Sequence, residues 1–184
     1  MFSQFKFVTG NQNKAREAAA ILEVPLEQVE VEGLYEIQTL DVEDLVRHKC
    51  LQAYEALKCP VLVEDSGLLF NAWKGLPGAF VKWFESTVGC EGMLQMMQSF
   101  QDRGATAVCC FAIHDGRDIQ VVRGEVPGTI ATEIRGANGF GWDVLFIPKG
   151  YESTYAEMSS EEKNAISHRK QALEKLKIIL REKN

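Results

Sequence analysis

The stretch Val61-Leu62-Val63-Glu64-Asp65-Ser66-Gly67 joins an apolar run to two adjacent carboxylates and a glycine. The run is too short for a helix, so it predicts a buried strand that delivers Glu64 and Asp65 to its carboxyl-terminal end. Ligands bind at that edge of open α/β sheets, and a pair of acids there is a candidate metal site or general base. The alternative is a strand that ends in an ordinary polar turn, because Asp, Ser and Gly are common turn residues.

The composition is that of a globular protein with no excess of positive charge. The chain has 184 residues, 46% hydrophobic and 25% charged, and this length predicts one domain spanning residues 1–184. Its 26 acidic and 20 basic side chains give a formal net charge of -6, which argues against binding to nucleic acid or to an anionic membrane. A bound polyanion would therefore need a local cluster of Lys and Arg, or a metal ion.

The five cysteines favour a reducing compartment. Their number is odd, no two of them have CxxC spacing, and most lie in apolar stretches, so we expect reduced thiols with a structural role. The first residues enter a predicted strand almost at once, and no apolar run approaches the length of a membrane span. We therefore expect a cytoplasmic protein.

A turn of small and polar residues follows the first predicted strand. The strand covers residues 5–8, and Thr9-Gly10-Asn11-Gln12-Asn13-Lys14 then leads into a helical pattern. Free backbone N–H groups at a helix start, together with Lys14, suit an anion. The segment is not a Walker loop, because the second glycine and the Gly-Lys-Ser/Thr ending are missing. The alternative is that Asn11 or Asn13 only caps the helix while Lys14 is solvated.

The remaining elements predict a mixed sheet. We expect a short strand over 29–31, a helix from an Asp41 N-cap to about Leu57, a strand over 106–114 and its antiparallel partner over 119–123. Residues 73–80 hold too much Gly and Pro for regular structure. Lys49 lies on the apolar stripe of the helix, where a lysine usually reaches the rim or meets a carboxylate or phosphate.

A second glycine-rich segment covers residues 136–143 and precedes the apolar run 144–147. Phe140 and Trp142 look exposed in this setting and could stack on a base, while Asp143 fixes its position. Further along, Ser159 and Glu162 predict a capping box that starts a helix, with a break near residue 167. Three side chains then bring positive charge near the buried side of the C-terminal helices: Lys163, His168 and Arg169.

Five short segments, taken in this order, resemble the motifs of the inosine triphosphate pyrophosphatase family: TGNxxK (9–14), VEDSG (63–67), GLPG (75–78), FGWD (140–143) and EKNxxSHR (162–169). The resemblance runs essentially from end to end. It implies an α/β fold with an elongated central mixed β-sheet flanked by helices, and two lobes around a nucleotide-binding cleft. It also implies a Mg²⁺-dependent enzyme, usually a homodimer, that hydrolyses deaminated purine nucleoside triphosphates such as ITP, dITP and XTP.

The resemblance also implies roles for individual residues. Asp65 is similar to the carboxylate that binds metal and activates water, and Lys14 would act with it in catalysis. Glu36 resembles the second metal ligand, although Glu43, Asp44 or Glu64 remain alternatives. The residues that would bind the substrate are Thr9, Gly10, Asn11, Gln12, Asn13, Lys14, Lys49, Ser66, Lys82, Phe140, Gly141, Trp142, Asp143, Lys163, His168 and Arg169.

Physical chemistry is consistent with such a site. Mg²⁺ is usually held by one or two carboxylates, with phosphate oxygens and water completing its shell. Phosphoryl chemistry needs mainly positioning and charge neutralisation, so no covalent nucleophile is required. Two rival functions remain: a pyrophosphatase of similar fold that acts on modified pyrimidine triphosphates, and a nucleotide sensor without turnover. The segments 140–143 and 167–169 match the purine enzymes, and the presence of Lys14 and Asp65 argues against lost catalysis.

Overall fold

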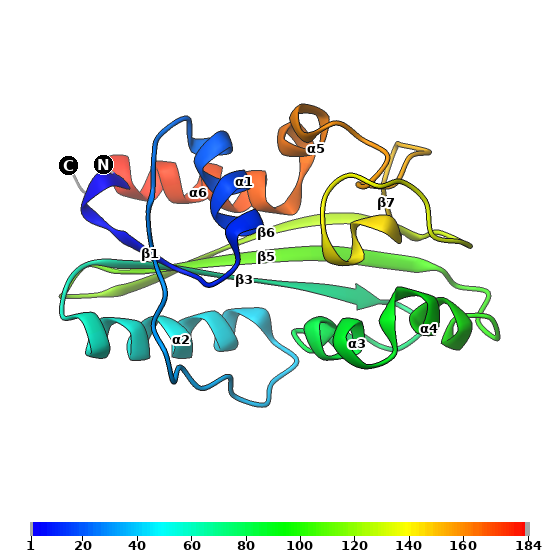
Figure 1. Ribbon diagram of the computed structural model, residues 1–184, viewed down its shortest axis with the longest axis horizontal. Helices are drawn as coiled ribbons and strands as arrows, with labels where there is room; N and C mark the ends of the chain where they lie inside the picture. Colours follow the sequence, from blue (N-terminus) through cyan, green and yellow to red (C-terminus); the bar gives the residue numbers. More distant parts are fainter. Residues whose placement is uncertain (1, 183–184) are drawn as a thin grey trace.

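The computed structural model describes residues 2–182, which form an elongated mixed sheet with helices on both faces (Figure 1). The strands are β1 (Lys6–Val8), β2 (Glu27–Val29), β3 (Val61–Phe70), β4 (Pro77–Gly78), β5 (Gly104–His114), β6 (Ile119–Ile130) and β7 (Phe146–Pro148). The helices are η1 (Phe2–Gln4), α1 (Gln12–Leu22), α2 (Val42–Leu57), α3 (Val81–Thr87), α4 (Gly89–Met96), η2 (Gly141–Val144), α5 (Ser160–Ile166) and α6 (His168–Glu182).

The sheet is mixed, as the sequence predicted. Its order is β2-β1-β3-β5-β6-β7, and β4 pairs with β3 outside this path. Strand β1 is parallel to β2 and β3, whereas the pairs β3–β5, β5–β6 and β6–β7 are antiparallel. The long strands β3, β5 and β6 therefore form the spine along the longest axis of the molecule (Figure 1).

Strand β3 does not end at the two acids, so that prediction was wrong. It continues through Glu64 and Asp65 to Phe70, because β5 pairs with it along its whole length and keeps its backbone hydrogen-bonded. The acids nevertheless lie at the end of the parallel part of the sheet. Neighbouring β1 stops at Val8, which pairs with Val63, directly before them. The edge at which the sequence placed a candidate site is thus defined by the end of β1.

Three other boundaries differ from the sequence-based prediction. Strand β2 covers 27–29 instead of 29–31, because its register is set by parallel pairing with β1. Strand β6 runs on to Ile130, because β5 begins at Gly104 and pairs with β6 up to Thr129. Within the Gly- and Pro-rich segment 73–80, Pro77 and Gly78 form β4 by pairing with β3. In each case the partner strand decides the boundary.

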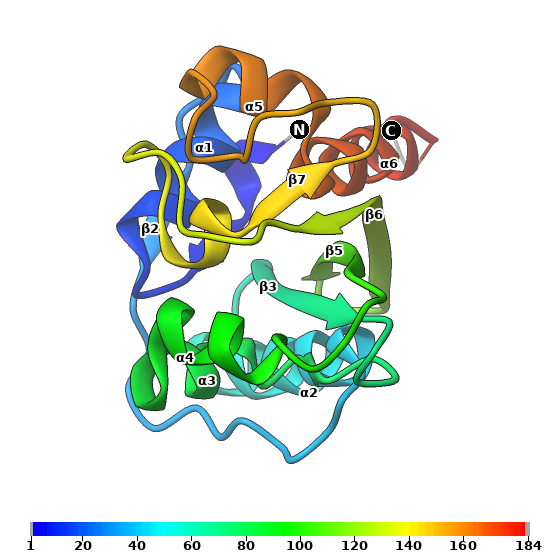
Figure 2. The ribbon, with the colours of Figure 1, turned by 90° about the vertical axis from the view of Figure 1, so that its right-hand side faces the viewer.

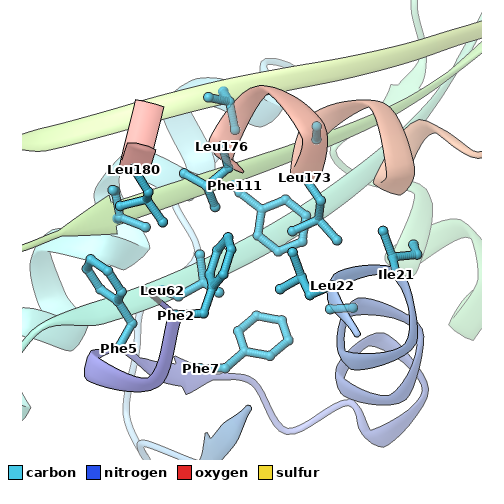
Figure 3. Close-up of a cluster of buried hydrophobic side chains, with 14 of the residues drawn as sticks. Phe2, Phe5, Phe7, Ile21, Leu22, Leu62, Phe111, Leu173, Leu176 and Leu180 are labelled. Carbon is cyan, nitrogen blue, oxygen red and sulfur yellow. The ribbon is translucent and has the colours of Figure 1, made fainter. Parts of the chain in front are cut away.

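The helices cover both faces of the sheet, with α1, α5 and α6 on one side and α2, α3 and α4 on the other (Figures 1 and 2). Between the sheet and helices α1 and α6 lies a cluster of buried side chains that includes Phe7, Leu62, Phe111, Leu173 and Leu176 (Figure 3). Full burial of a Leu or Phe contributes ~1.5–3 kcal/mol. This packing fixes α1 against the end of β1, where the candidate anion-binding turn lies.

The helix caps that the sequence predicted are present. Asn11 Oδ1 accepts the backbone N–H groups of Asn13 and Lys14 at 3.0 and 3.1 Å, and Asp41 caps α2. Ser159 starts α5 with a capping box, and the helical conformation is interrupted at Ser167, between α5 and α6. Among residues 2–182, no helix is both long and apolar enough to cross a membrane.

Candidate active site

A cavity of about 910 Å³ opens where β1 ends, between the sheet, α3, the segment 140–143 and the start of α6. This volume is typical of small-molecule sites. Every residue that the sequence and the resemblance assigned to a site lines it: Thr9, Gly10, Asn11, Gln12, Asn13, Lys14, Glu36, Lys49, Asp65, Ser66, Lys82, Phe140, Gly141, Trp142, Asp143, Lys163, His168 and Arg169. Segments that are far apart in the chain thus meet around one hollow.

The turn after β1 combines both interpretations that the sequence left open. Asn11 caps α1, as the simpler alternative proposed. Lys14 is not solvated, however, because its side chain is only 14% exposed and its Nζ lies 3.3 Å from Asp65 Oδ1. The turn therefore lines the cavity and contributes a shielded ammonium to it.

Lys49 reaches two carboxylates from the stripe of α2, one of the partners expected for a lysine there. Its Nζ lies 2.7 Å from Asp65 Oδ2 and 3.2 Å from Glu36 Oε1. Lys82 is more distant, with Nζ 3.8 Å from Glu36 Oε1, and its side chain is 75% exposed. One ammonium therefore lies where carboxylates from β3 and from the loop before α2 converge.

Charge pairing keeps these groups ionised. Burial, the largest single influence, would raise the pKa of Asp65, but Lys14 and Lys49 outweigh it and hold that pKa well below its usual range. Burial would lower the pKa of Lys14, but Asp65 and then Glu64 outweigh it and raise that pKa. Burial, the largest influence, would also lower the pKa of Lys49, but the charge and hydrogen bond of Asp65 outweigh it and raise that pKa. Asp65 is thus a carboxylate at neutral pH.

Glu64 is buried and binds a different set of partners. Its Oε1 accepts hydrogen bonds from Arg169 Nη2 at 3.1 Å and from the Cys109 thiol at 3.3 Å. Burial raises the pKa of Cys109, so the thiol keeps the proton that it donates. Glu64 Oε2 lies 3.4 Å from Lys14 Nζ, but it accepts no hydrogen bond from the described residues. Glu64 therefore links the lysine of the turn to the arginine of α6.

The segment 140–143 differs from the expectation of two exposed aromatic rings. Trp142 is only 6% exposed and packs with Phe146, Tyr155 and His168, because the 3₁₀ turn η2 directs it into the core. Phe140 is half-buried at the cavity instead, with Lys163 Nζ 4.8 Å from its ring centroid. Only Phe140 of the two is placed to offer a ring to a ligand.

Asp143 holds the turn together. Its Oδ2 accepts the backbone N–H of Phe140 at 2.8 Å and the Lys163 ammonium at 2.5 Å. Burial, the largest influence, raises the pKa of Asp143 although Lys163 opposes that rise. His168 is fully enclosed, and burial followed by the charge of Arg169 lowers its pKa well below the usual range. The imidazole is therefore neutral.

The residues present fit a hard divalent cation such as Mg²⁺. No group of three or more potential protein ligands occurs within the described range, but Mg²⁺ commonly uses only one or two carboxylates. Glu36 Oε1 and Asp65 Oδ2 both contact the ammonium of Lys49. Two oxygen atoms that could bind a metal ion therefore converge on one positive charge. The alternatives Glu43 and Asp44 belong to the first turn of α2 and do not line the cavity.

The sequence model that describes the Ham1 protein family matches residues 5–179, which is nearly the whole chain. The chain belongs to the Ham1 family. The inosine triphosphate pyrophosphatase of Yarrowia lipolytica is 47% identical over 184 residues, covering 96% of this chain and 95% of the relative. The inosine triphosphate pyrophosphatase of Fusarium vanettenii is 44% identical over 179 residues, covering 96% of this chain and 95% of the relative. The solved Ham1 protein of Staphylococcus aureus superposes with a TM-score of 0.83 at 27% identity, covering 97% of this chain and all of that one.

Several carboxylates near the cavity of this Ham1 chain were missed by the sequence analysis, among them Glu17 and Glu85; Glu30 and Glu32 also line it. Glu17 Oε1 accepts a hydrogen bond from Lys163 at 2.7 Å, and its Oε2 pairs with Arg169. It follows Lys14 by three residues on α1, and this spacing puts both side chains on one helix face, a signal that could have found it. Glu85 lines the cavity from α3. No pattern in the sequence distinguishes it from a solvated helix residue.

Proposed function

We propose that this Ham1 chain hydrolyses deaminated purine nucleoside triphosphates, including ITP, dITP and XTP, in a Mg²⁺-dependent reaction. The products are the nucleoside monophosphate and pyrophosphate, so the activity would remove damaged nucleotides from the cellular pool. The single observation that carries the proposal is the cluster of Lys14, Lys49 and Asp65 beside the turn 9–14, inside a cavity of nucleotide size. The names of the curated relatives support the same activity.

The phosphate end of the cavity supplies position and charge. Backbone N–H groups of the turn and the ammonium groups of Lys14 and Lys49 bind phosphate oxygens. Bound Mg²⁺ would be held by Glu36 and Asp65, and it would neutralise charge that develops on those oxygens. Asp65 orients the water that attacks the α-phosphorus and accepts its proton. Asp65 is a carboxylate at neutral pH, which is the form that can accept this proton.

The base end of the cavity offers hydrogen-bond donors. Arg169 is buried, and although its Nη atoms pair with Glu17 and Glu64, its Nε has no hydrogen-bond partner among residues 2–182. An N–H without a partner can donate to the 6-oxo group of hypoxanthine or xanthine. Adenine presents an amino donor there and would leave Arg169 unsatisfied, a mismatch that can cost a factor of ~10⁴ to 10⁵ in a site built for the hydrogen bond. Phe140 stacks on the base.

We also propose the remaining properties that the family resemblance suggests: a single domain, a homodimer and a cytoplasmic location. All five cysteines are unpaired thiols in the structure, which suits a reducing compartment. Modified pyrimidine triphosphates are the rival substrates, and a nucleotide sensor without turnover is the rival class.

The deciding experiment is a pyrophosphate-release assay across a nucleotide panel. Purified protein is incubated with Mg²⁺, inorganic pyrophosphatase and ITP, XTP, GTP, ATP or a modified pyrimidine triphosphate, and phosphate is measured colorimetrically. We expect ITP and XTP to be hydrolysed far faster than ATP. Asp65→Asn should abolish turnover although the variant still folds, as checked by thermal melting, whereas the exposed control Asp118→Asn should retain turnover. Turnover of the pyrimidine substrate alone, or nucleotide binding without turnover, would favour the corresponding rival.

A further inference from the structure

Glu85 brings an unsatisfied carboxylate to the base end of the cavity. It lies on α3 and is half-buried, and its Oε1 is enclosed without a hydrogen-bond partner of normal geometry among residues 2–182, although the backbone N–H of Trp142 lies near enough to lower the pKa of the carboxyl. The carboxylate rests on the backbone of the segment 140–143, because a Cβ added to Gly141 would lie 2.6 Å from Oε1. A buried acceptor without a donor is costly unless a ligand supplies the donor.

The surroundings of this carboxylate are mostly anionic or neutral. Burial raises the pKa of Glu85, and the charge of Asp143 on η2 adds to that rise. Lys14 on α1 and the backbone N–H of Trp142 act in the opposite direction. The neighbouring thiol on α4, Cys90, has its own pKa raised to about 11, so it carries no charge. An additional negative charge next to Glu85 would be repelled.

The cations near the base end cannot compensate fully. The ammonium of Lys163 is already bound by Glu17 at 2.7 Å and by Asp143 at 2.5 Å. Arg169 is paired with Glu17 and with Glu64. An anionic base that enters this pocket would therefore meet neutralised cations on one side and the free oxygen of Glu85 on the other.

We propose that Glu85 is a specificity-determining residue that ranks the oxopurine substrates. This inference rests on the proposed function. Hypoxanthine is neutral at physiological pH and carries an N–H next to its 6-oxo group, which can donate to Glu85 Oε1. The xanthine base of XTP loses a ring proton near neutral pH and becomes an anion. Glu85 favours the neutral base that donates a hydrogen bond and disfavours the anionic one, so ITP is preferred over XTP as the pH rises.

The test compares kcat/KM for ITP and XTP at pH 5.5 and pH 8 in the wild type and in Glu85→Gln, which keeps the shape and removes the charge. At pH 8 the substitution should raise the XTP-to-ITP ratio about tenfold, mainly through a lower KM for XTP, which corresponds to ~1.4 kcal/mol. At pH 5.5, where a larger share of the base is neutral, the ratio should change less than at pH 8. Glu91→Gln, an exposed carboxylate on the adjacent α4, is the matched control and should leave both ratios unchanged.

An equal ratio in wild type and Glu85→Gln at both pH values would overturn the role of Glu85 while leaving the proposed function intact. Failure of the wild type to hydrolyse either nucleotide would refute the proposed function instead. Calorimetric binding of inosine and xanthosine monophosphates then still measures the discrimination, with the same expected ratio and the same refuting result. Glu85→Ala, checked by thermal melting, tests the same charge if the glutamine variant fails to fold.

Discussion

Replacing Lys49 by methionine should make the nucleotide-free protein bind divalent cations more tightly. The ammonium lies 2.7 Å from Asp65 Oδ2 and 3.2 Å from Glu36 Oε1, the two proposed metal ligands. The side chains of Lys49 and Asp65 are only 16% and 14% exposed, so solvent screens the pair weakly. A metal ion must displace this ammonium, and methionine keeps the apolar stem without the charge.

The size of the effect follows from the charges. At an effective dielectric constant of about 20, two unit charges 4 Å apart interact by ~4 kcal/mol. Partial exposure and the rehydration of the displaced ammonium remove about half of this, which leaves roughly 1.5–3 kcal/mol in favour of the metal. Such a gain corresponds to an affinity about 10 to 100 times higher.

The assay is calorimetric titration of Mn²⁺ and Mg²⁺ into nucleotide-free protein at fixed pH and ionic strength. Lys82→Met is the matched control, because Lys82 Nζ lies 3.8 Å from Glu36 Oε1 on a side chain that is 75% exposed. The metal affinity of this variant should differ from that of the wild type by less than about threefold. Turnover falls in Lys49→Met in any case, because the phosphates lose an ammonium, so activity alone does not decide. Unchanged or weaker metal binding in Lys49→Met would refute the competition between Lys49 and the metal.

Three further outcomes are expected. Glu36→Gln should raise the Mg²⁺ concentration needed for half-maximal turnover while Asp44→Asn does not, and the reverse pattern would move the second ligand to the first turn of α2. Arg169→Ala should reduce turnover of ITP much more than residual turnover of ATP, whereas equal losses would assign Arg169 to structure or phosphate binding. Ion pairs lower the pKa of Asp65 in the folded protein. They therefore stabilise the fold at pH values above the pKa that Asp65 has in the unfolded chain, and this stabilisation is lost as the pH falls. Urea denaturation should therefore show a stability difference between wild type and Asp65→Asn that is present at pH 7 and shrinks below pH ~4; a constant difference would contradict this.

The local sequence predicted the helices and strands that bury one face. It did not predict where strands end when a partner strand sets the boundary. The apolar run 61–63 correctly predicted a strand next to the ligand-binding edge. Nothing in Glu64 or Asp65 indicates that β5 continues to pair with β3 beyond them, because the donors and acceptors belong to residues about 45 positions away. The same reason explains the misplaced boundaries of β2 and β6, whose registers are set by β1 and β5.

The local sequence pattern also could not predict the orientation of side chains in loops. Phe140 and Trp142 have the same glycine-rich surroundings in the sequence and both line the cavity, yet Phe140 is half-buried whereas Trp142 is buried. The distinction comes from η2, which is closed by the contact of Asp143 with the Phe140 backbone and with Lys163, twenty residues later. Long-range pairing of a buried charge thus decides which aromatic ring can meet a ligand.

The charge balance of the site gives a physical reason for the metal dependence that we propose. The four shielded cations of the cavity wall, Lys14, Lys49, Lys163 and Arg169, are each paired with one or more of five carboxylates: Glu17, Glu36, Glu64, Asp65 and Asp143. This cluster is therefore not electropositive before a nucleotide arrives, even though it contains the Lys and Arg that an acidic protein would need for a polyanion. A triphosphate can take over Lys14 and Lys49 only if another cation neutralises the carboxylates that they leave. A divalent ion that arrives with the nucleotide meets this requirement, because it binds the phosphates and the released carboxylates together.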